Sequence, residues 1–138
     1  MSTLIYTSVR SPGIRFTRVK RAVEQVCGRL SYKDASIAVH FVGERRMRRL
    51  NRTYRGFDRP TDVLSFSLRE GEEHQGENDW GDIFLCVPYI RRQAKRFDVS
   101  YEEECLRMLV HGVLHLAGFD HQTRRQAKQM FALQEEFL

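Results

Sequence analysis

Cysteine, proline and long apolar runs are all scarce in this sequence. It contains three cysteines and three prolines among 138 residues, and 41% of the residues are apolar. The longest nearly continuous apolar stretch, residues 83–90, is interrupted by Pro88. It is far shorter than the about 20 apolar residues that a membrane-spanning helix needs. The composition therefore predicts a globular protein and excludes an integral membrane protein.

The few cysteines also bear on the cellular compartment. Cys27, Cys86 and Cys105 are odd in number and far apart, which excludes a disulfide scaffold and a cysteine-rich zinc finger. The first ten residues lack the basic segment and apolar run of a secretory signal. We therefore expect the protein to work in the reducing environment of the cytoplasm.

The spacing of apolar residues predicts an α+β fold. With no linker or repeat in view, residues 1–138 are expected to form a single domain with one core. Strands are expected over residues 4–8, 36–42, 61–67 and 81–86, and helices over residues 15–30, 44–55, 88–97, 100–117 and 122–138. The polar stretch 69–80 is expected to be a loop or a hairpin connection. Because the last two strands have no helix between them, the sheet is predicted to be mixed rather than doubly wound and parallel.

Positive charge is in excess, but it is unevenly distributed. The formal net charge is +5, and the segment 69–79 alone carries −4, so the rest of the chain carries +9. A small basic body of this kind is suited to binding polyanions, nucleic acid above all. A basic protein with no role in nucleic-acid binding is the alternative that charge alone leaves open.

Three of the five histidines lie within eleven residues, at His111, His115 and His121. The His-x3-His pair is expected on one face of a helix, with Cβ atoms about 5–6 Å apart. Gly118 is suited to end that helix in a left-handed conformation and to turn the chain back, so that His121 reaches the same ion. Three imidazoles with an open fourth position are typical of a catalytic zinc site. We expect one Zn²⁺ per chain, while nickel, copper and manganese stay open on ligand type alone.

The same spacing occurs in the metzincin proteases, whose pattern is His-Glu-x-x-His-x-x-Gly-x-x-His. Their Glu is the general base, and its position here is occupied by Gly112, which has no side chain. A metal-dependent hydrolase of peptides or small molecules is therefore an alternative that must find its proton acceptor elsewhere. Asp120, next to His121, either orients an imidazole or serves the turn, and we favour the turn.

Arginine is concentrated in the predicted helix 44–55 and in the turn after it. The segment from Glu44 to Arg59 has two acids and seven arginines: Arg45, Arg46, Arg48, Arg49, Arg52, Arg55 and Arg59. The planar guanidinium matches phosphate oxygens, so a few of them are expected to contact an RNA backbone while most form a solvated helix face. Arg55 stands apart, because it lies at the helix end just before Gly56, from where it can reach a neighbouring cleft.

These motifs together resemble the YbeY family, which comprises bacterial metal-dependent endoribonucleases that act on single-stranded RNA. Residues 51–66 follow the family pattern Asn-x-x-Tyr-Arg-x-x-Asp-x-Pro-Thr-Asp-Val-Leu-Ser-Phe. Gly81-Asp82 comes next, and residues 111–121 follow the pattern His-Gly-x-Leu-His-Leu-x-Gly-x-Asp-His. One departure lies near the expected cleft, where Phe57 replaces the lysine common in the family.

The resemblance implies a fold, a site and a role. The fold would be an α+β sandwich with a mixed sheet of about four strands and the histidine-bearing helix against it. His111, His115 and His121 would be the metal ligands, and Arg55 the functionally required arginine. The activity would be zinc-dependent, single-strand-specific RNA hydrolysis in 16S rRNA maturation, ribosome biogenesis and RNA quality control. Partners would be ribosomal RNA, the small ribosomal subunit and associated ribosomal proteins or a GTPase. A non-catalytic ribosome-assembly factor with a structural zinc is a further alternative.

Overall fold

The order of helices and strands along the chain is the predicted one. A computed structural model describes residues 2–32, 34–67 and 79–138. The strands are β1 (Ser2–Thr7), β2 (Ser36–Val42), β3 (Val63–Ser67) and β4 (Asp79–Cys86). The helices are α1 (Phe16–Arg29), α2 (Glu44–Arg55), α3 (Val87–Arg96), α4 (Tyr101–Leu116) and α5 (Arg124–Glu136). The predicted α+β class, with four strands and five helices, is confirmed.

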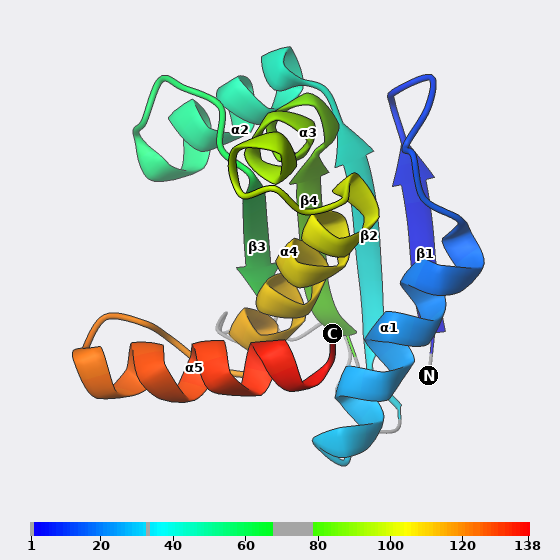
Figure 1. Ribbon diagram of the computed structural model, residues 1–138, viewed down its shortest axis with the longest axis vertical. Coiled ribbons are helices and arrows are strands. Elements are labelled where there is room, and N and C mark those ends of the chain that lie inside the picture. Colours follow the sequence, from blue (N-terminus) through cyan, green and yellow to red (C-terminus); the bar gives the residue numbers. More distant parts are fainter. Residues whose placement is uncertain (1, 33, 68–78) are drawn as a thin grey trace.

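The four strands form one mixed sheet in the order β1-β2-β4-β3. β1 pairs with β2, and β2 with β4, in parallel, whereas β3 and β4 are antiparallel. The mixed sheet expected from two successive strands without an intervening helix is therefore confirmed. The topology leaves β3 at one edge of the sheet, on the opposite side from β1 (Figure 1).

Two helices lie across one face of the sheet, and Figure 1 shows α1 and α4 in front of it. Ile37, Val39 and Phe41 alternate along β2 with a period of two and belong to the large core cluster that includes both helices. The opposite face has a smaller cluster, in which Met47 of α2 packs with Val42 and neighbouring apolar residues of the sheet. In the described part of the chain, no helix is long and apolar enough to cross a membrane.

Several element boundaries follow from local hydrogen bonds. Ser100 Oγ accepts a hydrogen bond from the backbone N–H of Glu103 at 3.1 Å, so the predicted start of α4 is confirmed. The helix expected from residue 122 begins only at Arg124, because Thr123 and Gln126 form a reciprocal capping box.

The strand and loop boundaries around β3 and β4 differ from the prediction. β3 begins at Val63 rather than at residue 61, because the chain bends at Asp62, whose Oδ1 accepts a hydrogen bond from the Val63 backbone N–H at 2.7 Å. Most of the loop expected over residues 69–80 lies outside the described residues. Its last two members, Asp79 and Trp80, belong to β4, so that strand is longer than predicted.

A buried carboxylate joins the last three helices. Glu104 of α4 is only 1% exposed. It accepts hydrogen bonds from Gln93 of α3 at 2.7 Å and from Arg107 of α4 at 2.8 Å. Arg107 also donates to Glu135 of α5 at 2.8 Å, and this network fixes α5 against α4. Burial of an ionised carboxylate is tolerated here because its charge is paired and hydrogen-bonded.

Replacing Arg107 by Ala leaves the Glu104 carboxylate buried without its cation. We expect Arg107→Ala to lower the free energy of unfolding by about 3 kcal/mol, measured by urea denaturation. Arg18→Ala is the control, because Arg18 pairs with Glu102 at 3.3 Å on the surface, and it should cost less than about 1 kcal/mol. Equal losses in both variants would contradict a structural role for the buried network.

Candidate metal centre

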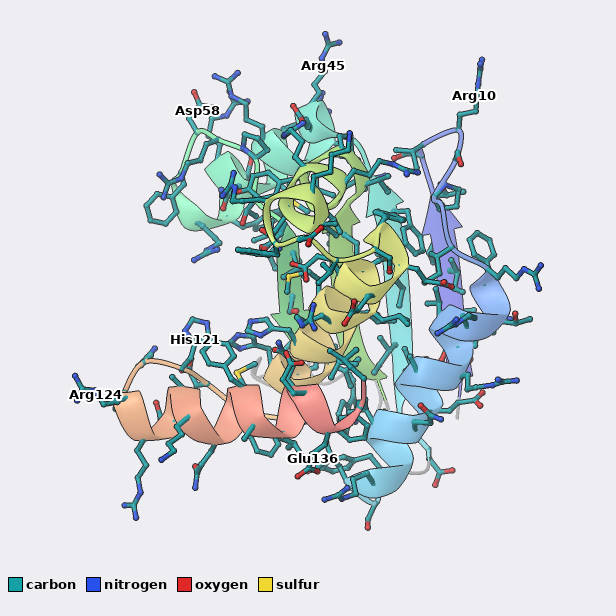
Figure 2. All side chains as sticks on the ribbon, viewed as in Figure 1. Arg10, Arg45, Asp58, His121, Arg124 and Glu136 are labelled. Carbon is teal, nitrogen blue, oxygen red and sulfur yellow. The ribbon has the colours of Figure 1, made fainter. Side chains whose placement is uncertain are left out.

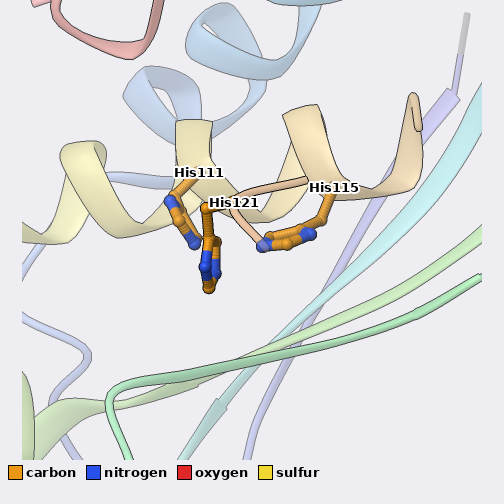
Figure 3. A group of neighbouring side chains, drawn as sticks. All are labelled: His111, His115 and His121. Atoms are coloured by element: carbon orange, nitrogen blue, oxygen red, sulfur yellow. The ribbon is translucent and has the colours of Figure 1, made fainter. Parts of the chain in front are cut away.

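Helix α4 presents two histidines to the same side. His111 and His115 are one turn apart, both half-buried, and their ring centroids are 4.7 Å apart. Figure 3 shows the two rings leaving the helix in the same direction. The predicted helical His-x3-His pair is therefore confirmed.

The third histidine arrives from the turn after α4. Gly118 has φ +101°, a left-handed conformation that glycine adopts without strain. The turn brings the His121 ring centroid to 5.6 Å from that of His111 and 5.1 Å from that of His115. One ligand atom from each of these residues lies within 4.8 Å of the other two. Such a cluster could hold one metal ion.

The turn also settles what Asp120 does in this structure. Its Oδ1 accepts a hydrogen bond from the backbone N–H of His121 at 2.7 Å. This is the turn role that we favoured over orientation of an imidazole. The carboxylate thus fixes the backbone that carries the exposed third histidine.

Burial keeps two of the imidazoles neutral. It lowers the pKa of His115 to about 4, and the neighbouring His111 and His121 contribute further. Burial also lowers the pKa of His111, although the hydrogen bond that its ring donates to Gln134 acts in the opposite direction. A metal ion binds the neutral imidazole, so both side chains are ready to act as ligands near neutral pH.

Gln134 on α5 is a site residue that sequence reasoning missed. It is 4% exposed, and its Oε1 lies 2.8 Å from His111 Nδ1. The amide oxygen accepts, so Nδ1 carries the proton and Nε2 keeps its lone pair for a metal ion. Gln134 is 23 positions from His111 in the chain, so only the packing of α5 on α4 reveals its partner.

Gly112 is required by close packing of α4 on the sheet. A Cβ at this position would lie 2.9 Å from Ile83 Cγ2 and 3.1 Å from Ser65 Oγ. Ser65 Oγ also donates to the Gly112 carbonyl at 3.3 Å. The position of the metzincin glutamate therefore faces the sheet, where no larger side chain fits. This packing counts against a metzincin-like mechanism.

A cleft of about 570 Å³ opens beside the three imidazoles. One wall is the end of α4 with its turn, and the other is β3, the edge strand, with the segment that leads into it. The lining includes the carboxylates Asp62 and Asp120 and the hydroxyl of Ser65. The imidazoles thus face a space that a substrate could enter.

Arg55 is the arginine that reaches this cleft. It is the last residue of α2, and Gly56 follows with φ +77° in a left-handed cap. Arg55 lines the cleft, and its charge lies close enough to His115 to contribute to the lowered pKa of that imidazole. Figure 2 shows Arg45, near the other end of α2, pointing away from His121. The arginine-rich helix therefore meets the site only at its end.

The fold is α+β, and three imidazoles converge beside an open cleft. This arrangement is typical of proteins that hold a catalytic metal ion with three histidines and one open position. Comparison with known proteins narrows this class. The profile of the family described as Endoribonuclease YbeY matches residues 11–138. The chain belongs to the YbeY family.

Individual relatives agree with that assignment. An "Endoribonuclease YbeY" from Persephonella marina is 38% identical over 119 residues, which cover 86% of this chain and 78% of that protein. One from Geobacillus thermodenitrificans is 44% identical over 115 residues, covering 77% and 72%. A solution structure of a protein from Thermotoga maritima matches with a TM-score of 0.70 and 31% identity, over 98% of this chain and 85% of that chain. The resemblance stated from the motifs is confirmed.

The hydrogen bond from His111 to Gln134 should matter for metal affinity. We expect Gln134→Ala to bind Zn²⁺ about 10- to 100-fold more weakly, because the His111 ring loses the partner that fixes its tautomer and orientation. Gln129→Ala is the matched control, since Gln129 is exposed on the same helix. The measurement is competition against a chromophoric chelator, and equal affinities would show that Gln134 does not orient the ligand.

Proposed function

We propose that this protein is a zinc-dependent endoribonuclease that hydrolyses single-stranded RNA, and that residues 1–138 work as one metallo-endoribonuclease domain. The observation that carries the proposal is the meeting of three imidazoles and Arg55 in one cleft. Membership of the YbeY family, whose curated relatives are named endoribonucleases, gives the substrate class.

His111, His115 and His121 would hold the metal ion. Three observations support the fit: the ligand atoms lie within 4.8 Å of one another, burial keeps two imidazoles neutral, and Gln134 orients the first of them. Zinc is our first choice because three imidazoles with an open position suit it best. When bound, the ion supplies Lewis acidity toward water and phosphoryl oxygens.

Arg55 would act on the phosphate. Its guanidinium lines the same cleft as the imidazoles, so a phosphodiester placed there meets a two-pronged donor of fixed positive charge. Charge that develops on the phosphoryl oxygens during cleavage is then stabilised more than charge in the ground state. We therefore assign Arg55 a catalytic role and the three histidines a ligand role.

The proposed biological setting rests on the resemblance to the YbeY family. We propose that the substrate is ribosomal RNA and that the protein acts in 16S rRNA maturation, ribosome biogenesis and RNA quality control. Its partners would be the small ribosomal subunit and associated ribosomal proteins or a GTPase. A cytoplasmic location is supported by the cysteines, because Cys27, Cys86 and Cys105 are all free and buried.

Two alternative functions differ from the proposed one in what they predict for RNA. A hydrolase of peptides or small molecules would use the same centre, but the Gly112 position faces the sheet and has no room for the metzincin base. A ribosome-assembly factor with structural zinc would need a closed site, whereas these imidazoles border a cleft and His121 is exposed. Both alternatives predict that purified protein leaves RNA intact.

The direct test is cleavage of single-stranded RNA by metal-loaded protein. We expect cleavage by the unmodified chain, little cleavage of a fully paired duplex, and at least a hundredfold loss in His111→Ala, in step with loss of bound metal. The measurements are gel-resolved cleavage under single-turnover conditions and metal content by elemental analysis. Undiminished cleavage by metal-free His111→Ala would contradict the proposed centre.

Arg55→Ala separates catalysis from binding. We expect it to raise the activation free energy for cleavage of RNA by about 2–4 kcal/mol when the RNA is saturated with protein. The metal content should be unchanged, because Arg55 is not a ligand. Arg55→Lys should recover part of the rate, since a point charge replaces a forked donor.

The matched control for Arg55 is Arg45→Ala. Arg45 lies near the other end of α2, and its side chain points away from His121 (Figure 2). Arg45→Ala should cleave saturated RNA at the normal rate. If Arg55→Ala also does so, Arg55 is a binding contact and its catalytic role is wrong.

A further inference from the structure

Phe57 is an exposed aromatic ring that packs into neither hydrophobic cluster. It lies just after the left-handed turn at Gly56, and 46% of the residue is exposed. It is absent from the core on the α1 and α4 face and from the smaller cluster around Met47. The ring therefore belongs to neither part of the hydrophobic core.

The loop that carries this ring is firmly held. Asp58 accepts two hydrogen bonds from Arg48, at 2.9 and 3.1 Å, and these bonds lower the pKa of its carboxyl group. Asn51 Nδ2 donates to the Arg59 carbonyl at 2.8 Å, and the Phe57 backbone N–H donates to the Asn51 carbonyl at 3.4 Å. Because these bonds hold the backbone that carries the ring, little backbone freedom is lost when a ligand binds there.

Two guanidinium groups lie over the ring. The Cζ atom of Arg55 is 5.6 Å from the ring centroid, and that of Arg59 is 5.1 Å from it. Arg55 also lines the cleft of the three imidazoles. Because the Arg55 guanidinium is next to the ring and also lines the cleft, the ring stands beside the place where Arg55 would meet a phosphate.

We propose that Phe57 is a base-stacking residue, which takes the unpaired nucleobase of a nucleotide adjacent to the phosphate bound by Arg55. In the free protein the ring is covered by guanidinium groups. On binding, these groups turn to the phosphates and a base takes their place on the ring. Aromatic rings interleaved with cations are the usual means of binding single-stranded nucleic acid without regard to sequence.

The inference rests on the proposed ribonuclease function and deepens it. A base within a duplex is already stacked and paired, so it reaches the ring only at the cost of unpairing. Stacking on Phe57 would therefore contribute to a preference for single strands. The residue acts on binding and positioning, whereas Arg55 acts on the phosphate.

The test uses short single-stranded RNAs that contain the fluorescent base 2-aminopurine at successive positions. Stacking on an aromatic ring quenches this base, and gels confirm that the RNA stays intact during the measurement. We expect one position to be quenched by the unmodified protein and by Phe57→Trp, but not by Phe57→Leu. Affinity should fall about 5- to 100-fold in Phe57→Leu.

Phe16→Leu is the matched control. Phe16 is 39% exposed on α1, which lies beside β1 (Figure 1). β1 is the edge strand opposite β3, whose residues line the cleft. Phe16→Leu should bind and quench like the unmodified protein. An abasic nucleotide at the quenched position gives the second arm, because it removes the base while Phe57→Leu removes the ring.

The outcomes separate the two proposals. If the abasic RNA and Phe57→Leu each weaken binding and together weaken it no further, the base stacks on the ring. The other outcome is that Phe57→Leu weakens binding of the intact and of the abasic RNA by the same factor, or weakens neither. If cleavage persists in that case, the stacking role is wrong and the ribonuclease function stands. If the unmodified chain neither binds nor cleaves RNA, both proposals fall.

Discussion

The site depends on the close approach of α4 to the sheet at Gly112. The absence of a side chain lets the helix backbone settle against Ile83 and Ser65, with the Ser65 hydroxyl bonded to the Gly112 carbonyl. His111 and His115 flank this contact on the same helix, so their distance from the edge strand β3 is set by it. A larger residue would force the helix outward and widen the cleft, since packed interiors transmit added volume as backbone shifts.

A second constraint comes from α5, although none of its residues is among the described residues that line the cleft. Its Gln134 fixes the His111 ring, and its Glu135 receives the Arg107 guanidinium that also neutralises the buried Glu104. Adjacent residues of one helix thus serve the imidazole and the helix–helix junction. The orientation of a ligand is in this way tied to the stability of the C-terminal half of the fold.

The arginines illustrate how tertiary structure divides roles among similar side chains. Asp58 engages Arg48 closely and Arg52 at 3.7 Å, so part of the charge of α2 is used to hold its own following loop. Arg45 points away from the site (Figure 2), and Arg55 reaches it because α2 ends there. Composition alone predicted a basic surface, and among the described residues Arg55 is the one arginine that lines the cleft beside the three histidines.

The sequence by itself determined the three-histidine centre, because the signal is local: four-residue spacing on a helix and a glycine that turns the chain back. It also determined the mixed sheet, through two strands with no helix between them. Only the tertiary structure decided the sheet order, the longer β4 and the partnership of Gln134 with His111. These features depend on contacts between residues far apart in the chain, as with Gln134 and His111, which are separated by 23 positions. Apolar periodicity in a sequence identifies the buried face of a helix or strand, but it does not identify the residues that pack against that face.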